Sequence, residues 1–98
     1  MDAYVSNLIK ELGKQFRIEI DPKNPSLEDK LKLIGALDET ENYELQWYAM
    51  EIAVGRRIDA QEQELPFLFA TYLLTKTKKQ DLSFYKNLAE HYGQNSSL

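Results

Sequence analysis

The side chains that most often carry enzyme chemistry are few in this sequence and do not form a recognised pattern. The chain has one histidine, His91, and no cysteine. No Asp or Glu stands three or four residues from His91, the spacing that puts two metal ligands on one face of a helix. We therefore interpret His91 as a solvated residue near the end of a helix, where a cation is favourable.

Carboxylates suggest a second kind of chemistry, because Glu41, Glu44 and Glu51 follow one another along a short segment. A di-metal site in a helix bundle also needs two Glu-x-x-His motifs, and the sequence contains none. The serines have no histidine base nearby in the sequence, and the glycines stand singly, unlike those of a phosphate-binding loop. We therefore expect no enzymatic activity, no catalytic residue, no metal and no cofactor.

Lysines near the carboxyl end suggest nucleic-acid binding. A helix that follows a basic link can enter a major groove. However, the formal net charge of the chain is −4, and no glycine of the helix-turn-helix type precedes the last predicted helix. DNA or RNA binding is therefore our alternative to protein binding. The lysines concerned are Lys76, Lys78, Lys79 and Lys86.

The segment 43–58, YELQWYAMEIAVGRRI, is apolar on two opposite sides when it is drawn as a helix. Its alternation also fits two short strands, but its many strong helix formers and the lack of a turn dipeptide favour a helix. Such a helix is either covered twice inside a bundle or presents one side to a partner. One stripe holds Tyr43, Trp47, Met50, Val54 and Ile58, and the other holds Leu45, Tyr48 and Ile52.

The segment 65–74, LPFLFATYLL, is the second candidate for a partner-facing helix. It carries more large apolar side chains than a single buried stripe can hide. It is about half as long as a membrane-spanning helix needs to be. We therefore expect part of it to lie at an interface.

The surplus of aromatic side chains predicts a docking surface, because Trp and Tyr are enriched at protein interfaces. Acidic side chains beside it would steer a basic partner. The alternative is that the aromatics fill the core. The predicted partner-binding residues are Tyr43, Trp47, Tyr48, Phe67, Phe69 and Tyr72, and the predicted steering residues are Glu39, Glu41 and Glu44.

These residues must be positioned by helices, and the sequence predicts an all-α fold, a small antiparallel bundle of four to five helices. We expect residues 1–93 to form one domain and 94–98 to form a flexible tail. The first predicted helix is capped by Asp2, with Gly13 at its end or in its interior, and is followed by an extended connector at 17–20 and a turn at 21–25. A second helix is opened by Ser26, and the central helix at about 41–55 is capped from within 38–41 and ended by Gly55. A helix at about 65–75 follows, and the last helix is capped by Asp81 and stopped by Gly93.

The same features suggest the class of protein. The first residues lack the basic and then apolar pattern of a signal peptide, and the lack of cysteine fits a reducing compartment. We therefore expect a cytoplasmic protein without a membrane span. Its expected function is that of a small adaptor, accessory, chaperone-like or inhibitor/immunity-type protein that binds another protein, or a second copy of itself as a homodimer.

Overall fold

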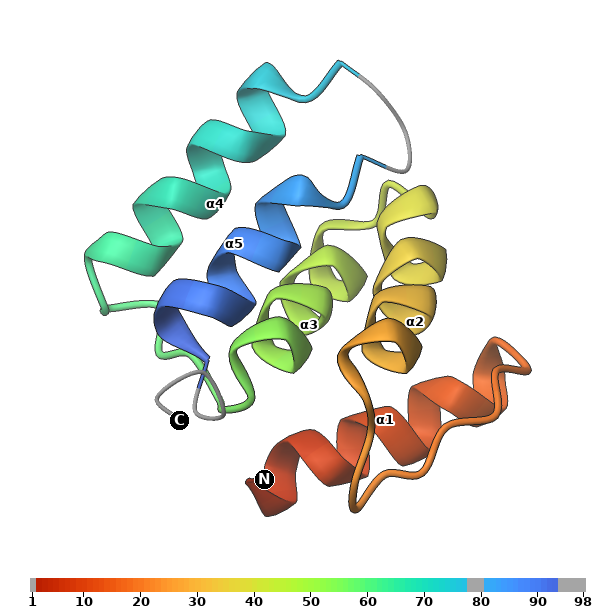
Figure 1. Ribbon diagram of the computed structural model, residues 1–98. Coiled ribbons are helices and arrows are strands. Elements are labelled where there is room, and N and C mark those ends of the chain that lie inside the picture. Colours follow the sequence, from red (N-terminus) through yellow and green to blue (C-terminus); the bar gives the residue numbers. More distant parts are fainter. Residues whose placement is uncertain (1, 78–80, 94–98) are drawn as a thin grey trace.

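The computed structural model describes residues 2–77 and 81–93, and none of them is in a β-strand. Figure 1 shows a helix bundle in which α3 lies inside, with α2 and α5 beside it and α1 across the lower ends of α2 and α3. The predicted all-α bundle is therefore confirmed. The helices are α1 (Ala3–Gln15), α2 (Leu27–Glu39), α3 (Tyr43–Val54), α4 (Glu64–Thr75) and α5 (Ser83–Tyr92).

The central helix α3 begins later than its predicted start within 38–41. Helix α2 continues to Glu39, and Glu41 turns the chain with a left-handed backbone, φ 56°. The cap of α3 is Asn42, whose side chain accepts a hydrogen bond from the Leu45 N–H at 3.2 Å. At the other end Gly55 has φ 82°, so it ends the helix in the left-handed conformation that glycine favours, as predicted.

From Ala49 onward α3 is buried on all sides. Met50 and Val54 of one predicted stripe and Ile52 of the other have no exposed surface. A helix that is apolar on opposite sides is either covered on both sides within the bundle or presents one side to a partner. This part of α3 is covered on both sides within the bundle. Only the start of α3, at Tyr43, presents a large apolar side chain to solvent.

Helix α1 runs past Gly13 and ends in a Schellman motif, with hydrogen bonds from Ile18 N–H to Gly13 O (2.8 Å) and from Arg17 N–H to Lys14 O (3.2 Å). Arg17 occupies the left-handed position of this motif, with φ 57°. A Cβ at Gly13 would lie 3.0 Å from the Ile18 carbonyl oxygen, so the chain returns close to the helix at this point. The connector therefore begins after Arg17 and not at the predicted residue 17, and its Ile18 and Ile20 pack against the core as expected.

The remaining boundaries agree closely with the sequence. The Ser26 side chain caps α2 by accepting from the Asp29 N–H at 3.1 Å. Helix α4 starts at Glu64, one residue before the predicted start, so that Pro66 lies in its first turn. The N-cap of α5 is Leu82 and not the predicted Asp81, although the Asp81 side chain accepts from the Ser83 N–H at 3.1 Å, and α5 ends before Gly93 as predicted. The predicted tail at 94–98 lies outside the described residues.

None of the described helices combines the length and the hydropathy of a membrane span.

Candidate docking surface

Helix α4 is buried on one side and apolar on the other. Leu65 and Phe69 are core residues, whereas 69% of Phe67 and 87% of Leu74 is exposed. Residues spaced by three, four and seven lie on one face of a helix, and this face also carries the exposed Ala70 and Thr71. We call Phe67, Ala70, Thr71 and Leu74 the α4 outer face.

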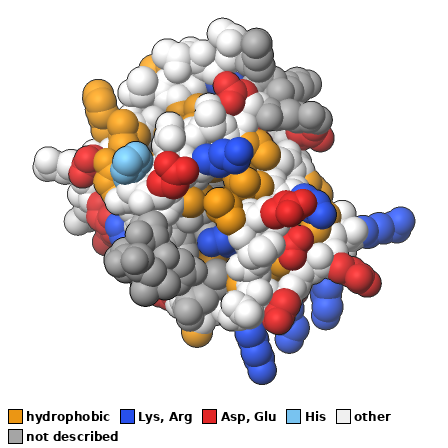
Figure 2. Space-filling model, in the orientation of Figure 1, with side chains coloured by type: hydrophobic (Ala, Val, Ile, Leu, Met, Phe, Trp, Pro, Cys, Tyr) orange, Lys and Arg blue, Asp and Glu red, His pale blue; other side chains and the backbone are white. Residues whose placement is uncertain are grey.

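The position of α4 in the bundle leaves this face open. Figure 1 shows α4 at the edge of the molecule, with α5 along one side of it. In the space-filling view, a hydrophobic side chain projects from the outline at the upper left, where α4 lies (Figure 2). The Thr71 hydroxyl donates to the Phe67 carbonyl oxygen at 3.0 Å, so its polar group is satisfied within the helix.

Tyr43 adds a second exposed aromatic side chain next to α4. Its ring is 62% exposed and lies 5.6 Å from the Phe69 ring and 6.3 Å from the Trp47 ring, measured between centroids. Trp47 is half-buried and also packs edge-on against Phe69, at 5.5 Å. The start of α3 and the inner side of α4 are therefore joined by aromatic contacts that leave part of Tyr43 accessible.

The other predicted docking residues are less accessible. Phe69 is 1% exposed and belongs to the core. For this residue the alternative considered from the sequence, that the aromatic side chains fill the core, is the one observed. Tyr72 is half-buried and stacks on Phe84 at 4.2 Å. Tyr48 is half-buried as well, and its hydroxyl donates to Glu44 at 2.8 Å, an interaction that raises the pKa of Tyr48.

The three predicted steering residues lie together at the corner between α2 and α3. Glu39, Glu41 and Glu44 are all exposed and flank Tyr43 in the sequence. All three residues are therefore accessible to solvent, and the Glu44 carboxylate also accepts from the Tyr48 hydroxyl at 2.8 Å. Their effect on a basic partner stays a prediction.

Sequence reasoning missed a buried polar cluster around Asp38. Its side chain has no exposed surface and accepts from Lys76 Nζ at 2.6 Å, the Tyr85 hydroxyl at 2.9 Å and the Tyr72 hydroxyl at 3.1 Å. Gln46 donates to the Asp38 backbone carbonyl at 3.3 Å. Asp38 thus joins α2 to α3, α4 and α5. The available signal was the pair at 72 and 76, because residues four apart share a helix face.

Burial and the nearby carboxylate affect the two tyrosines of this cluster. Burial raises the pKa of Tyr85 and of Tyr72, and the negative charge of Asp38 raises both further. Both hydroxyls therefore remain donors at neutral pH. The Lys76 ammonium group is paired with the Asp38 carboxylate at 2.6 Å, and little of its side chain is exposed for binding a phosphate group.

The other predicted nucleic-acid residues are Lys78, Lys79 and Lys86, and the described part of the chain shows no basic surface that joins Lys86 to Lys76. Lys86 is exposed on α5. Lys78 and Lys79 lie outside the described residues. The ion pair of Lys76 with Asp38 therefore removes one of the four predicted contacts, and the alternative is weakened to that extent.

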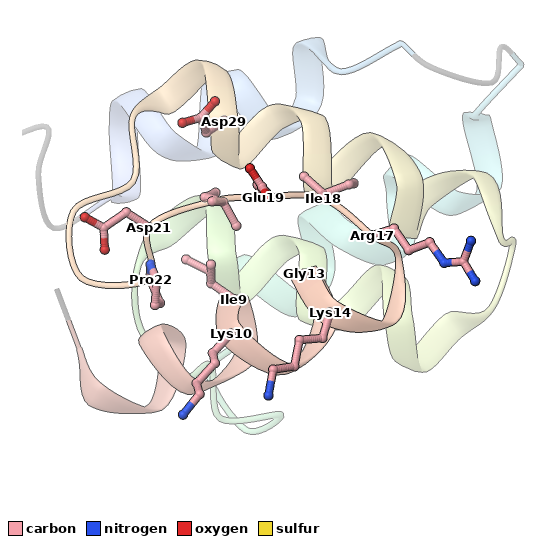
Figure 3. Close-up of a pocket in the computed structure, with 11 residues that line it drawn as sticks. Ile9, Lys10, Gly13, Lys14, Arg17, Ile18, Glu19, Asp21, Pro22 and Asp29 are labelled. Carbon is pink, nitrogen blue, oxygen red and sulfur yellow. The ribbon is translucent and has the colours of Figure 1, made fainter.

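A groove of about 720 Å³ separates α1 from the connector that follows it (Figure 3). Its apolar lining includes Ile9, Ile18 and Pro22. In Figure 3, Lys10 and Lys14 project outward from α1, and Arg17 points away from the groove. The three basic groups therefore do not converge on the groove as they would around an anionic substrate.

Over residues 2–77 and 81–93, no three His, Asp or Glu side chains come together in a way that could hold a metal ion.

Protein-family models, curated proteins and solved structures gave no match to this chain. A proposal about function therefore depends on the surfaces of the molecule itself. Of these, the α4 outer face carries the two most exposed of the large hydrophobic side chains described. The groove beside α1 has both acidic and basic residues in its lining, but its three basic side chains do not converge on it.

Proposed function

We propose that this protein is a small helical interaction module that docks another protein through the α4 outer face. The observation that carries the proposal is the exposure of Phe67 and Leu74, at 69% and 87%, on the same side of one helix. Fully burying a Phe or Leu side chain contributes about 1.5–3 kcal/mol. A contiguous exposed apolar face is typical of interaction sites.

The inner side of α4 supports this proposal, because it holds the helix in place without any help from the outer face. Phe69 fills the core, and Tyr72 and Lys76 both bond to the buried Asp38. A helix fixed in this way presents Phe67 and Leu74 in a preformed arrangement. Preorganisation reduces the entropy lost on binding.

The proposed mechanism is non-covalent docking without a catalytic step, as in an adaptor, accessory, chaperone-like or inhibitor/immunity-type protein. The partner supplies an apolar surface that covers the α4 outer face. A second copy of the chain is the simplest partner. The absence of cysteine fits a reducing compartment, so we place this docking in the cytoplasm.

The experiment that tests the proposal compares two matched leucine variants. Leu74→Glu puts a charge on the α4 outer face, whereas Leu27→Glu changes an exposed leucine (43%) at the start of α2. The immobilised proteins are incubated with an extract of the source cells. A protein retained by the wild type and by Leu27→Glu, but lost from Leu74→Glu, supports the proposal. Equal retention by both variants would contradict it.

A separate retention experiment tests nucleic-acid binding. If that alternative holds, the double variant Lys78→Glu, Lys79→Glu should abolish retention on DNA or RNA at low salt. A wild-type protein that is not retained even at low salt would end that alternative.

A further inference from the structure

We propose that Lys30 is a reactive amine that small, uncharged aldehydes modify by forming an imine. Lys30 lies on α2, so this modification is independent of docking at the α4 outer face. Two features of the side chain carry the inference. It is almost fully buried, and it has no hydrogen bond or ion pair with any of the described residues.

Lys30 occupies the buried face of α2. Only 6% of the residue is exposed. Leu33, Ile34 and Leu37 follow it by three, four and seven positions, so they lie on the same face of the helix, and none of them has exposed surface. This helix packs against α1, α3 and α5. A lysine is rarely buried to this extent unless it is paired.

No carboxylate of the described residues neutralises the Lys30 ammonium group. The two buried carboxylates of that part of the chain are Asp38 and Glu51. Asp38 binds Lys76 at 2.6 Å, and Glu51 accepts from the Tyr4 hydroxyl and from a backbone N–H. The other charged side chains of the helices that pack against α2 are exposed, namely Lys10, Glu11 and Lys14 on α1, Glu44 on α3, and Lys86, Glu90 and His91 on α5.

Burial therefore acts on Lys30 unopposed. It is the only cause that lowers the pKa of the Lys30 amine. On α2 itself, Asp29 is paired with Lys32 at 4.0 Å. Lys30 also lies in the first turn of α2, where the helix dipole disfavours a cation. At a given pH, more of this amine is therefore neutral than in a lysine that is surrounded by water.

The Lys30 nitrogen is nevertheless accessible. Within the described part of the chain, every buried side-chain nitrogen or oxygen has a hydrogen-bond partner. Lys30 has no such partner there, so its Nζ must reach solvent. The aliphatic stem is thus buried and the tip lies at the surface, as is common for a lysine beside apolar residues. With 6% of the residue exposed, the opening suits a small reagent.

An aldehyde is the electrophile that matches this amine. The ammonium group first gives its proton to solvent, and the neutral Nζ attacks the carbonyl carbon with its lone pair. The resulting carbinolamine loses water, which leaves a C=N bond between the aldehyde carbon and Nζ. Because the imine carries no charge when it is unprotonated, the reaction removes a charge that is buried without a partner. Burial therefore favours modification at Lys30 over modification at an exposed lysine.

Reductive labelling with formaldehyde and cyanoborohydride tests the reaction at every lysine of the folded protein at once. Cyanoborohydride reduces the imine, and mass mapping of peptides assigns the methylated residues. Each labelling rate is measured as a function of pH and divided by the limiting rate of the same residue at alkaline pH, which separates ionisation from access. The exposed Lys10 is the internal reference. At pH 7 the normalised rate of Lys30 should exceed that of Lys10 at least about threefold.

Two results of this experiment would overturn the inference. If Lys30 stays unlabelled at every pH, the aldehyde cannot reach it. If Lys30 and Lys10 share one pH profile, the Lys30 amine is ordinary. In concentrated urea the two profiles should merge, and a difference that persists in the unfolded chain would assign the reactivity to local sequence instead of burial.

Lys76 controls for labelling through unfolding, because its side chain is 12% exposed but is held by the Asp38 carboxylate. At pH 7 Lys30 should react at least about threefold faster than Lys76, since only Lys30 lacks a counter-charge. Equal rates would mean that both residues react only when the chain opens, and Lys30 would then have no special reactivity.

The variant Lys30→Met keeps an apolar side chain on the buried face and removes the amine. It should fold, lose the label at this position and show a higher urea midpoint than the wild type, because no unpaired charge is then buried. Retention of a partner through the α4 outer face should not change. A lower urea midpoint would show that the amine stabilises the folded chain through a partner, and the inference would be wrong.

Discussion

Lys76 and Asp38 form an ion pair of 2.6 Å in which the Asp38 side chain is fully buried and the Lys76 side chain is 12% exposed. Asp38 lies in the last turn of α2, where the helix dipole disfavours a negative charge. Lys76, at the end of α4, supplies the opposite charge at Oδ2, and two tyrosine hydroxyls donate to the other carboxylate oxygen, Oδ1. The pair thus fixes the helix that presents the proposed docking surface.

Removing the lysine should expose the cost of burying Asp38. We expect Lys76→Met to lower the free energy of unfolding by about 3–5 kcal/mol, because it leaves a buried carboxylate without its counter-charge. Urea denaturation measures the change. Lys86→Met is the matched control and should stay within about 0.5 kcal/mol of the wild type, since Lys86 is exposed. Equal stabilities for the two variants would show that the ion pair contributes nothing.

Alkaline pH should destabilise the protein through Tyr72 and Tyr85, whose pKa values are raised by burial and by Asp38. Below about pH 10 these tyrosines keep their protons in both the folded and the unfolded chain, so their contribution is complete. Above that pH the unfolded chain releases protons first, and the free energy of unfolding falls as pH rises.

Denaturation between pH 8 and 11.5 measures this slope. The decline should be shallower in the double variant Tyr72→Phe, Tyr85→Phe than in the wild type. Tyr43→Phe, which changes an exposed tyrosine, serves as the control. A double variant with the wild-type slope would assign the alkaline sensitivity to other groups.

The helices could be predicted because their signals are local. Ser26 caps α2 through the N–H of a residue three positions away, and Gly55 ends α3 through its own backbone. The Asp38–Lys76 pair spans 38 residues, and no local pattern links its partners. Sequence reasoning therefore placed Asp38 among cap residues and Lys76 in a nucleic-acid site.

Glu51 is the second fully engaged carboxylate in the core. It is 1% exposed and accepts from the Tyr4 hydroxyl at 2.7 Å and from the Ile58 N–H at 2.8 Å. Glu51→Gln should cost about 1–3 kcal/mol, because one donor would then face the amide NH₂ group. Glu44→Gln is the exposed control and should change stability by less than about 0.5 kcal/mol. Similar denaturation midpoints for the two variants would contradict this role for Glu51.

Arg17 holds a backbone conformation that suits glycine better, with φ 57°. Arg17→Gly should therefore raise the free energy of unfolding by about 0.5–1 kcal/mol, the net of relieved strain and a more flexible unfolded chain. Lys14→Gly, within the last turn of α1, should have the opposite effect and cost about 0.5–1 kcal/mol. Thermal denaturation of both variants checks the signs, and a less stable Arg17→Gly would show that its side chain stabilises the fold.

Phe67 and Phe69 differ by two positions, and therefore by about 200° around the helix. The sequence establishes that they point to opposite sides of α4, but not which side faces the bundle. That choice is made by contacts with Trp47, Tyr43 and Phe84, which lie on other helices. The prediction of a docking surface could therefore include both residues, although only one is exposed.

The two phenylalanines should consequently respond in opposite ways to truncation. Phe69→Ala should cost about 3–5 kcal/mol of unfolding free energy, because it empties a buried aromatic site. Phe67→Ala should change stability by less than about 0.5 kcal/mol, since 69% of the side chain is already in solvent, yet it should weaken retention of the docked partner. Parallel denaturation and retention experiments measure both properties. A Phe67→Ala protein that is as destabilised as Phe69→Ala would place Phe67 in the core, and the α4 outer face would lose its role.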